Sequence, residues 1–86
     1  MSILKKIDLD ARELEHPKPL EEAIKVLRSL ENENYFYMLH RKNPIPLIDL
    51  ANEQGFCTLS KEDAAGTWHI LIAKNTDIAL EDLLRV

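Results

Sequence analysis

The chain is short, acidic and of ordinary globular composition. Its 86 residues are 45% hydrophobic and 30% charged, which argues against disorder and leaves room for one packed core. A single cysteine excludes an intramolecular disulfide and a zinc site built from several cysteines. The net charge of −4 opposes non-specific binding to nucleic acid, and no apolar stretch is long enough to cross a membrane. Because the first residues lack the pattern of a signal peptide, we expect a cytoplasmic protein without nucleic-acid or membrane partners.

A strand and a helix are well marked at the beginning of the chain. Residues 3–11 alternate apolar and polar side chains in their second half, which predicts a half-buried strand. Pro17 and Pro19 suit a first helical turn, because the amide donor that proline lacks has no partner there. Apolar residues then recur at helical spacing through residues 20–30, which predicts an amphipathic helix.

The middle of the chain repeats this order and then changes to a hairpin. Residues 35–41 carry aromatic and bulky apolar side chains on both alternating faces, which predicts an interior strand. Two prolines in segment 43–46 begin a second helix, and Gly55 supplies the left-handed residue that ends it. Strands predicted at 56–61 and 67–74 form a hairpin around a polar turn.

The end of the chain is more apolar than a solvated terminus. Thr76 can cap a short helix that runs to Leu84. The apolar residues of this segment are Ile78, Leu80, Leu83, Leu84 and Val86. We therefore assign residues 1–75 to one α/β domain and residues 76–86 to an apolar tail or short helix that docks on the open sheet face or on a partner.

The order of elements is strand, helix, strand, helix, strand, strand. Right-handed crossovers place both helices on one face of the sheet, which predicts two layers. The sheet then has one face covered by helices and one open face. Trp68 and Ile70 share one side of the last strand, so His69 and Leu71 occupy the other. The open face also carries one of two alternating sets from the second strand, either Tyr35 and Tyr37 or Phe36 and Met38.

The first part of the chain resembles the opening of TusA-like (SirA-like) sulfur-carrier proteins. Asp-Leu-Asp-Ala-Arg at 8–12 is followed by Leu14 and by His-Pro-Lys-Pro-Leu at 16–20, where those proteins have Leu-Asp-x-Arg-Gly-Leu-x-Cys-Pro-x-Pro. The resemblance covers roughly residues 7–74 as an order of elements, and its first motif is the specific part. It implies an α+β fold: a two-layer βαβαββ sandwich with a mixed four-stranded sheet, two helices on one face and the last strand antiparallel to the others. The motif implies a site at Arg12, His16, Pro17 and Pro19.

Two departures separate this chain from the sulfur carriers. Their sulfur-bearing cysteine corresponds to His16, and the glycine of their Arg-Gly-Leu corresponds to Glu13. The Asn-Pro-Ile-Pro-Leu segment is instead similar to a cysteine-less, TusA-related branch of unknown function, which often has Asp-Pro-x-Pro-Leu there. Asn43, Pro44 and Pro46 are therefore a second candidate site.

His16 precedes a helix start, where the positive end of the helix dipole favours a thiolate in the sulfur carriers. An imidazole cannot hold a persulfide, so sulfur relay through this position is excluded. The functional alternatives for His16 are a metal ligand, a proton donor or a contact for an anion. We favour an exposed histidine without a special role, because local spacing provides no acid or base partner.

The other candidate groups favour structural roles. Cys57 lies at the start of a strand, where a small apolar side chain commonly packs into the core. His16, His40 and His69 lack the spacing of metal ligands, and the basic residues 40–42 are interpreted as a solvated strand end. The sequence contains no glycine-rich phosphate loop and no nucleophile-base-acid pattern. We assign no catalytic residue and expect neither a metal nor another cofactor.

These observations favour a non-enzymatic binding or adaptor module of TusA-like fold. It would work through the start of the first helix or through the open sheet face, with a protein partner or a second copy as the cover of that face. The alternative is a redox or sulfur-metabolism component that uses His16 or Cys57.

We predict that the protein does not accept sulfur from a persulfide donor, because the relay cysteine is replaced by His16. Native mass spectrometry after incubation with such a donor should show no gain of a sulfur atom. The variant His16→Cys should fold like the wild type, since the residue precedes a helix and is expected to be exposed. Loss of cooperative unfolding in that variant would show that His16 is a core residue.

Overall fold

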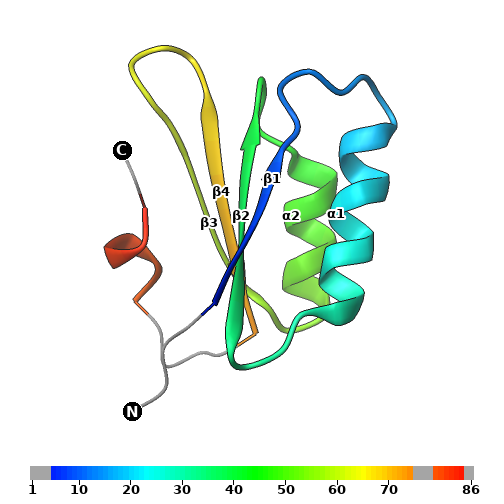
Figure 1. Cartoon of the computed structure of the whole chain (residues 1–86), viewed down its shortest axis with the longest axis vertical. Helices are drawn as coiled ribbons and strands as arrows, with labels where there is room; N and C mark the ends of the chain where they lie inside the picture. Colours follow the sequence, from blue (N-terminus) through cyan, green and yellow to red (C-terminus); the bar gives the residue numbers. More distant parts are fainter. Residues whose placement is uncertain (1–4, 75–78, 85–86) are drawn as a thin grey trace.

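A computed structural model describes residues 5–74 and 79–84 (Figure 1). The elements are β1 (Lys5–Asp10), α1 (Lys18–Ser29), β2 (Asn34–His40), α2 (Ile45–Glu53), β3 (Cys57–Glu62), β4 (Trp68–Ala73) and a 3-10 turn, η1 (Leu80–Asp82). β1 pairs in parallel with β2, and β4 pairs antiparallel with β2 and β3, so the sheet order is β1-β2-β4-β3. Both helices cover the same face (Figure 1), which confirms the predicted βαβαββ sandwich with a mixed sheet. Neither helix of the described ranges has the length and apolar character of a membrane span.

The helix ends follow the proline and glycine signals. Pro17 immediately precedes α1, and Pro44 immediately precedes α2. At the other end of α2, Gly55 adopts a φ of 85°, which side chains rarely tolerate. Its N–H donates to the carbonyl of residue 52 at 3.1 Å, and the N–H of Phe56 donates to the carbonyl of Ala51 at 3.0 Å. These two bonds pair carbonyls that the helix end would otherwise leave open, and the chain turns directly into β3.

The main core lies between the sheet and the two helices. Phe36 and Met38 of β2 are fully buried there, together with Ile70 of β4. This arrangement decides the alternation that the sequence left open, because Tyr35 and Tyr37 must then face the other side of the sheet. Trp68 and Ile72 of β4 belong to the same core as Ile70, which confirms that these three residues share the side of the sheet that faces the helices.

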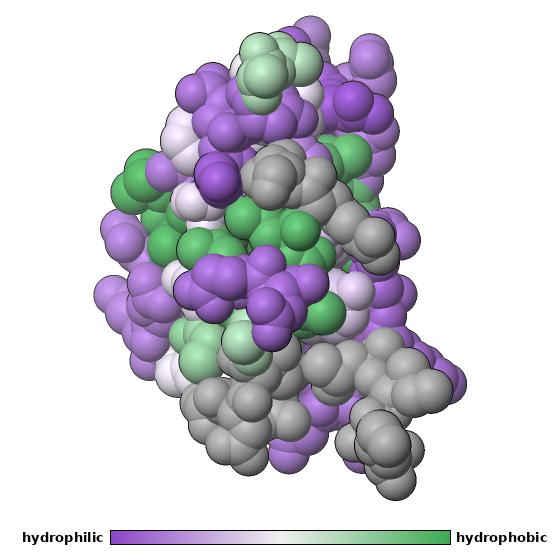
Figure 2. Space-filling model, turned by 90° about the vertical axis from the view of Figure 1, so that its left-hand side faces the viewer, coloured by the Kyte–Doolittle hydropathy of each residue, from purple (hydrophilic) through white to green (hydrophobic). Residues whose placement is uncertain are grey.

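A second apolar cluster, which we call the open-face cluster, lies on the side of the sheet away from the helices. Its buried members are Tyr35, Tyr37, Leu71, Ala73 and Leu80, with Leu39, Cys57, Leu59, Leu83 and Leu84 packed against them. Figure 2 looks onto this side, and apolar residues gather in its middle with polar residues around them. The described part of the tail therefore packs on the sheet.

The predicted C-terminal helix is shorter than expected. The described part contains a single 3-10 turn, Leu80–Asp82, and the predicted start at residues 76–78 lies outside the described residues. Val86 also lies outside them. The division into a domain of residues 1–75 and a tail of residues 76–86 stays a prediction.

We predict that Leu80→Ala lowers the free energy of unfolding by about 2 kcal/mol, because a buried leucine loses its contacts with the open-face cluster. The neighbouring exposed residue provides a matched control, and Glu81→Ala should change stability little. Urea unfolding of both variants measures the difference. Wild-type stability in Leu80→Ala would contradict the packing of η1 on the sheet.

Candidate functional site

Two strands end and two helices begin at one end of the molecule. β1 and β2 are parallel, and each is followed by a helix that runs back along the sheet (Figure 1). The carboxyl ends of β1 and β2 therefore lie beside the amino ends of α1 and α2. In sheets with parallel strands this end commonly binds ligands, because helix starts present unpaired amide donors and the loops carry variable side chains.

A cavity of about 360 Å³ lies at this end of the sandwich, and we call it the helix-start pocket. Its apolar lining consists of Leu14, Pro19, Leu20, Met38, Pro44, Ile45, Pro46 and Leu47. Its polar lining consists of His16, His40, Arg41, Lys42 and Asn43. The cavity is thus largely apolar with a few convergent polar groups, which is the usual composition of a small-molecule site.

The helix-start pocket is positive although the chain is acidic. Arg41 and Lys42 line it, and none of the described lining residues is an aspartate or a glutamate. The whole chain, in contrast, has 15 acids and 11 bases. The amino ends of α1 and α2 add the positive ends of two helix dipoles. The pocket therefore favours an anionic group over a cationic one.

Arg41 also connects two of the segments that line the pocket. Its Nη2 donates to the carbonyl oxygen of Leu14 at 3.2 Å, which connects the end of β2 to the loop between β1 and α1. A guanidinium has five N–H donors, so this bond leaves others that a ligand can use.

His40 is a buried polar residue of the pocket, with 5% of its surface exposed. The backbone N–H of Arg41 donates to its Nδ1 at 2.8 Å, so the neutral ring carries its proton on Nε2. Burial, followed by the charges of Lys42 and Arg41, lowers the pKa of His40 below its usual value of 6.5. The interpretation of residues 40–42 as a solvated strand end is therefore wrong for His40, although Arg41 and Lys42 are exposed. Side-chain direction explains the difference, because the His40 side chain points to the helix side, as Met38 does.

Asn43 contributes an unsatisfied acceptor. Its Oδ1 is buried and has no hydrogen-bond partner within the described ranges. An unpaired buried acceptor costs roughly 1–3 kcal/mol of stability.

The pocket joins the two sites that the sequence indicated separately. His16 and Pro19 of the TusA-like motif line it, and so do Asn43, Pro44 and Pro46 of the second segment. His16 is exposed, as expected. The parallel pairing of β1 with β2 brings the two segments together, and no spacing in the sequence reveals this.

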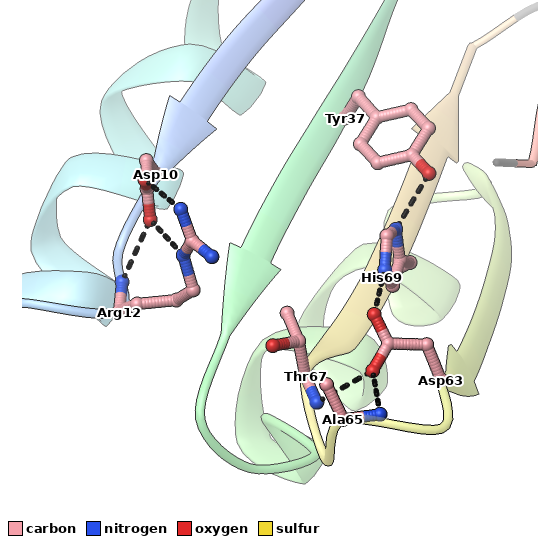
Figure 3. Close-up of polar contacts among 7 residues, drawn as sticks. All are labelled: Asp10, Arg12, Tyr37, Asp63, Ala65, Thr67 and His69. Carbon is pink, nitrogen blue, oxygen red and sulfur yellow. Dashed lines mark hydrogen bonds and ion pairs between the residues drawn. The ribbon is translucent and has the colours of Figure 1, made fainter. Parts of the chain in front are cut away.

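Two residues of the predicted motif site do not line the pocket. Pro17 is exposed, and the peptide bond that precedes it is cis. Arg12 pairs with Asp10 at the end of β1, with Nε 2.9 Å from Oδ1 and Nη2 2.7 Å from Oδ2 (Figure 3). This side-chain hydrogen bonding and the Arg12 backbone N–H lower the pKa of Asp10 to about 2. Arg12 therefore pairs with the last residue of β1 and does not line the cavity.

A hydrogen-bonded chain that the sequence did not reveal lies on the open sheet face (Figure 3). The Tyr37 hydroxyl lies 2.7 Å from His69 Nδ1, and His69 Nε2 lies 2.8 Å from Asp63 Oδ2. Asp63 Oδ1 accepts the N–H groups of Ala65 at 2.9 Å and Thr67 at 3.0 Å. The bond to His69, followed by these backbone bonds, lowers the pKa of Asp63.

The hydrogen bonds that join Tyr37, His69 and Asp63 have a defined direction when the His69 ring is neutral. An ionised Asp63 only accepts, so His69 donates from Nε2 and the neutral ring accepts the Tyr37 hydroxyl proton at Nδ1. The chain connects the hairpin turn to the middle of the sheet. The only signal in the sequence was the predicted outward direction of His69, because its partners lie 32 and 6 residues away.

Cys57 and the histidines occupy different parts of the fold. Cys57 is partly buried and packs against the open-face cluster. It therefore lies on the opposite side of the sheet from the helix-start pocket. His16 and His40 line the pocket, whereas His69 belongs to the open face. No group of three or more metal-binding side chains occurs within residues 5–74 and 79–84.

The chain matches a family of conserved proteins. A family described as "Uncharacterized conserved protein (DUF2249)" matches residues 8–74, which include both segments that form the pocket. The match covers more than half of the chain, so the chain belongs to this family. Comparison with curated proteins and with solved structures gave no match.

We predict that Asp10 and Asp63 contribute to acid unfolding. Both have a folded-state pKa below the unfolded value of 3.8, so their ionised forms stabilise the fold above about pH 4. This contribution is lost as the pH falls through the folded-state pKa, which is about 2 for Asp10. Asp10→Asn and Asp63→Asn should each flatten the decrease in the free energy of unfolding over this range.

Chemical denaturation at a series of pH values measures that slope. Glu53→Gln, which changes an exposed acid at the end of α2, serves as the control for a change in net charge. A slope in Asp63→Asn equal to that of the wild type would contradict the ionised state of Asp63 in its chain with His69.

Proposed function

We propose that this member of the DUF2249 family is a small non-enzymatic binding module that holds an anionic, partly apolar small molecule in the helix-start pocket. The observation that carries the proposal is the charge of the lining. Arg41 and Lys42 line the cavity without an acidic residue among the described lining side chains, in a chain of net charge −4. Two helix starts at the same place favour the same sign of ligand charge.

The apolar part of the lining indicates that the ligand also has an apolar part. Met38 and Leu47 are fully buried and line the cavity. Ile45, at the start of α2, is a large apolar side chain with 51% of its surface exposed. A ligand with an apolar part would cover Ile45 and remove that surface from water. A bare inorganic anion would leave it exposed.

The resemblance to TusA-like sulfur carriers supports a ligand site at this position in the fold. Their functional cysteine stands where His16 stands here, and His16 lines the pocket. Replacement of the cysteine removes sulfur relay and leaves a place that can still contact a ligand. We infer binding without catalysis because the Nδ1 of His40 already accepts a backbone N–H, and no carboxylate of the described lining can assist either histidine.

The open sheet face is a weaker candidate for a charged ligand. A second cavity of about 360 Å³ there is lined by Lys6, Asp8 and Asp10 among others. Lys6 Nζ lies 3.2 Å from an oxygen of Asp8, and Asp10 is paired with Arg12. These charges are largely compensated within the chain, so this cavity lacks the single sign of charge that marks the helix-start pocket.

The sulfur or redox alternative has less support. Cys57 packs against the open-face cluster, on the other side of the sheet from the pocket. His16 lacks the chemistry for a persulfide. No observation favours this alternative over binding.

The test compares three probes of similar length: hexanoate, 1-hexanol and hexylamine. Hexanoate should shift the backbone amide signals of the non-proline residues of segment 40–47, because only it combines an anionic group with an apolar chain. Hexylamine should not shift them. Lys42→Gln should weaken hexanoate binding about threefold, as expected for one exposed charge. The control Lys61→Gln changes an exposed lysine of β3 outside the pocket lining and should leave the affinity unchanged.

NMR titration measures the shifts and the affinities together. Equal shifts with hexylamine and hexanoate would contradict the role of charge. Shifts confined to residues of the open-face cluster would move the binding site to the other side of the sheet and overturn the proposal.

A further inference from the structure

His40 gives the helix-start pocket a group whose charge can change with pH. We propose that the pocket takes up its anion together with a proton, and that the ring of His40 accepts this proton. The inference rests on the proposed function and specifies how that site is regulated.

The ring is held in its neutral form when the pocket has no ligand. Its Nδ1 accepts the backbone N–H of Arg41 at 2.8 Å, so a second proton has to enter at Nδ1. That proton would leave the Arg41 N–H without its acceptor. It would also place a charge on a side chain that is 5% exposed. Burial and hydrogen bonding thus both oppose protonation.

The charges around His40 oppose protonation as well. Arg41 and Lys42 follow it in the chain, and both lower its pKa. The loop before α1 contributes His16 to the lining, and the residue opposite on β4 is the uncharged Trp68. The lining residues from α1 and α2 carry no charge. Every formal charge in the described lining is therefore positive.

A bound anion changes the electrostatic environment of His40. Bound beside Arg41 and Lys42, it compensates their charges and favours the protonated form of His40. The pKa of His40 is then higher in the complex than in the unbound protein. Linkage is reciprocal, so affinity for the anion must rise as the pH falls through the interval between these two pKa values. Above the higher value the ring is neutral in both states, and the affinity stays at its lower limit.

The experiment needs an anion that does not titrate. We choose 1-hexanesulfonate, whose charge stays constant, so that any pH dependence comes from the protein. If binding raises the pKa of His40 by one unit, the affinity for hexanesulfonate should increase by at most about tenfold between about pH 8 and a pH below both pKa values. NMR should also show the titration midpoint of the His40 ring protons moving to higher pH when hexanesulfonate is present.

Two variants separate His40 from the other histidine of the pocket. In His40→Asn, the side-chain oxygen can still accept the Arg41 N–H, but the residue does not titrate. This variant should bind hexanesulfonate with little pH dependence. His16→Gln removes the exposed histidine and should keep the dependence of the wild type.

The outcomes distinguish the two levels of inference. Binding of hexanesulfonate with the same affinity at every pH would overturn the proton coupling and leave the proposed function intact. A pH dependence that persists in His40→Asn and disappears in His16→Gln would also overturn it. If His40→Asn does not fold, the titration midpoint of the His40 ring in the wild-type protein, with and without hexanesulfonate, still tests the proton coupling. Failure of both hexanesulfonate and hexanoate to shift the amide signals of residues 40–47 would overturn the proposed function and this inference together.

Discussion

The parallel pairing of β1 with β2 is the constraint on which the rest of this structure depends. The ladder runs from the pair Lys5 and Asn34 to the pair Asp10 and Leu39, and the N–H of Ala11 extends it by donating to the Leu39 carbonyl at 2.8 Å. Both strands therefore end at the same level. Because each crossover returns on the same face, both helices begin at that level too. A pocket at this end is a consequence of topology, and its chemistry depends on the residues that follow each strand.

The two faces of the sheet use polar groups in different ways. On the open face, Lys6 and Asp8 pair with each other, and the chain from Tyr37 through His69 to Asp63 satisfies its buried members. On the helix side, the polar lining of the pocket carries positive charge with no acidic side chain among the described lining residues, and Asn43 Oδ1 has no partner within the described ranges. Internal pairing makes the first face suited to stability. The unpaired acceptor of Asn43 costs stability within the protein.

The sequence patterns predicted the elements well and the surroundings of single side chains poorly. Prolines and Gly55 marked the helix ends correctly, because they restrict the local backbone whatever packs around it. The pattern of residues 35–41 was apolar on both faces and could not show which side met the helices. In the structure both faces of β2 are buried, with Phe36 and Met38 in the main core and Tyr35 and Tyr37 in the open-face cluster. His40 was interpreted as solvated because it begins the basic run 40–42 at a strand end, although it shares the helix side with Met38 and Phe36.

By itself, the sequence determined the order of elements, the two-layer sandwich and the candidate segments at His16 and Asn43. The order of elements and the two layers depend on local propensity, on spacing within one element and on the handedness of crossovers. The two candidate segments were indicated by the resemblance to TusA-like proteins. Only the tertiary structure decided that the two segments line one cavity, that this cavity is positive, and that Tyr37 meets His69. Contacts of this kind join residues far apart in the chain, such as the 32 positions between Tyr37 and His69. Their geometry depends on strand register and helix packing, which no local pattern specifies.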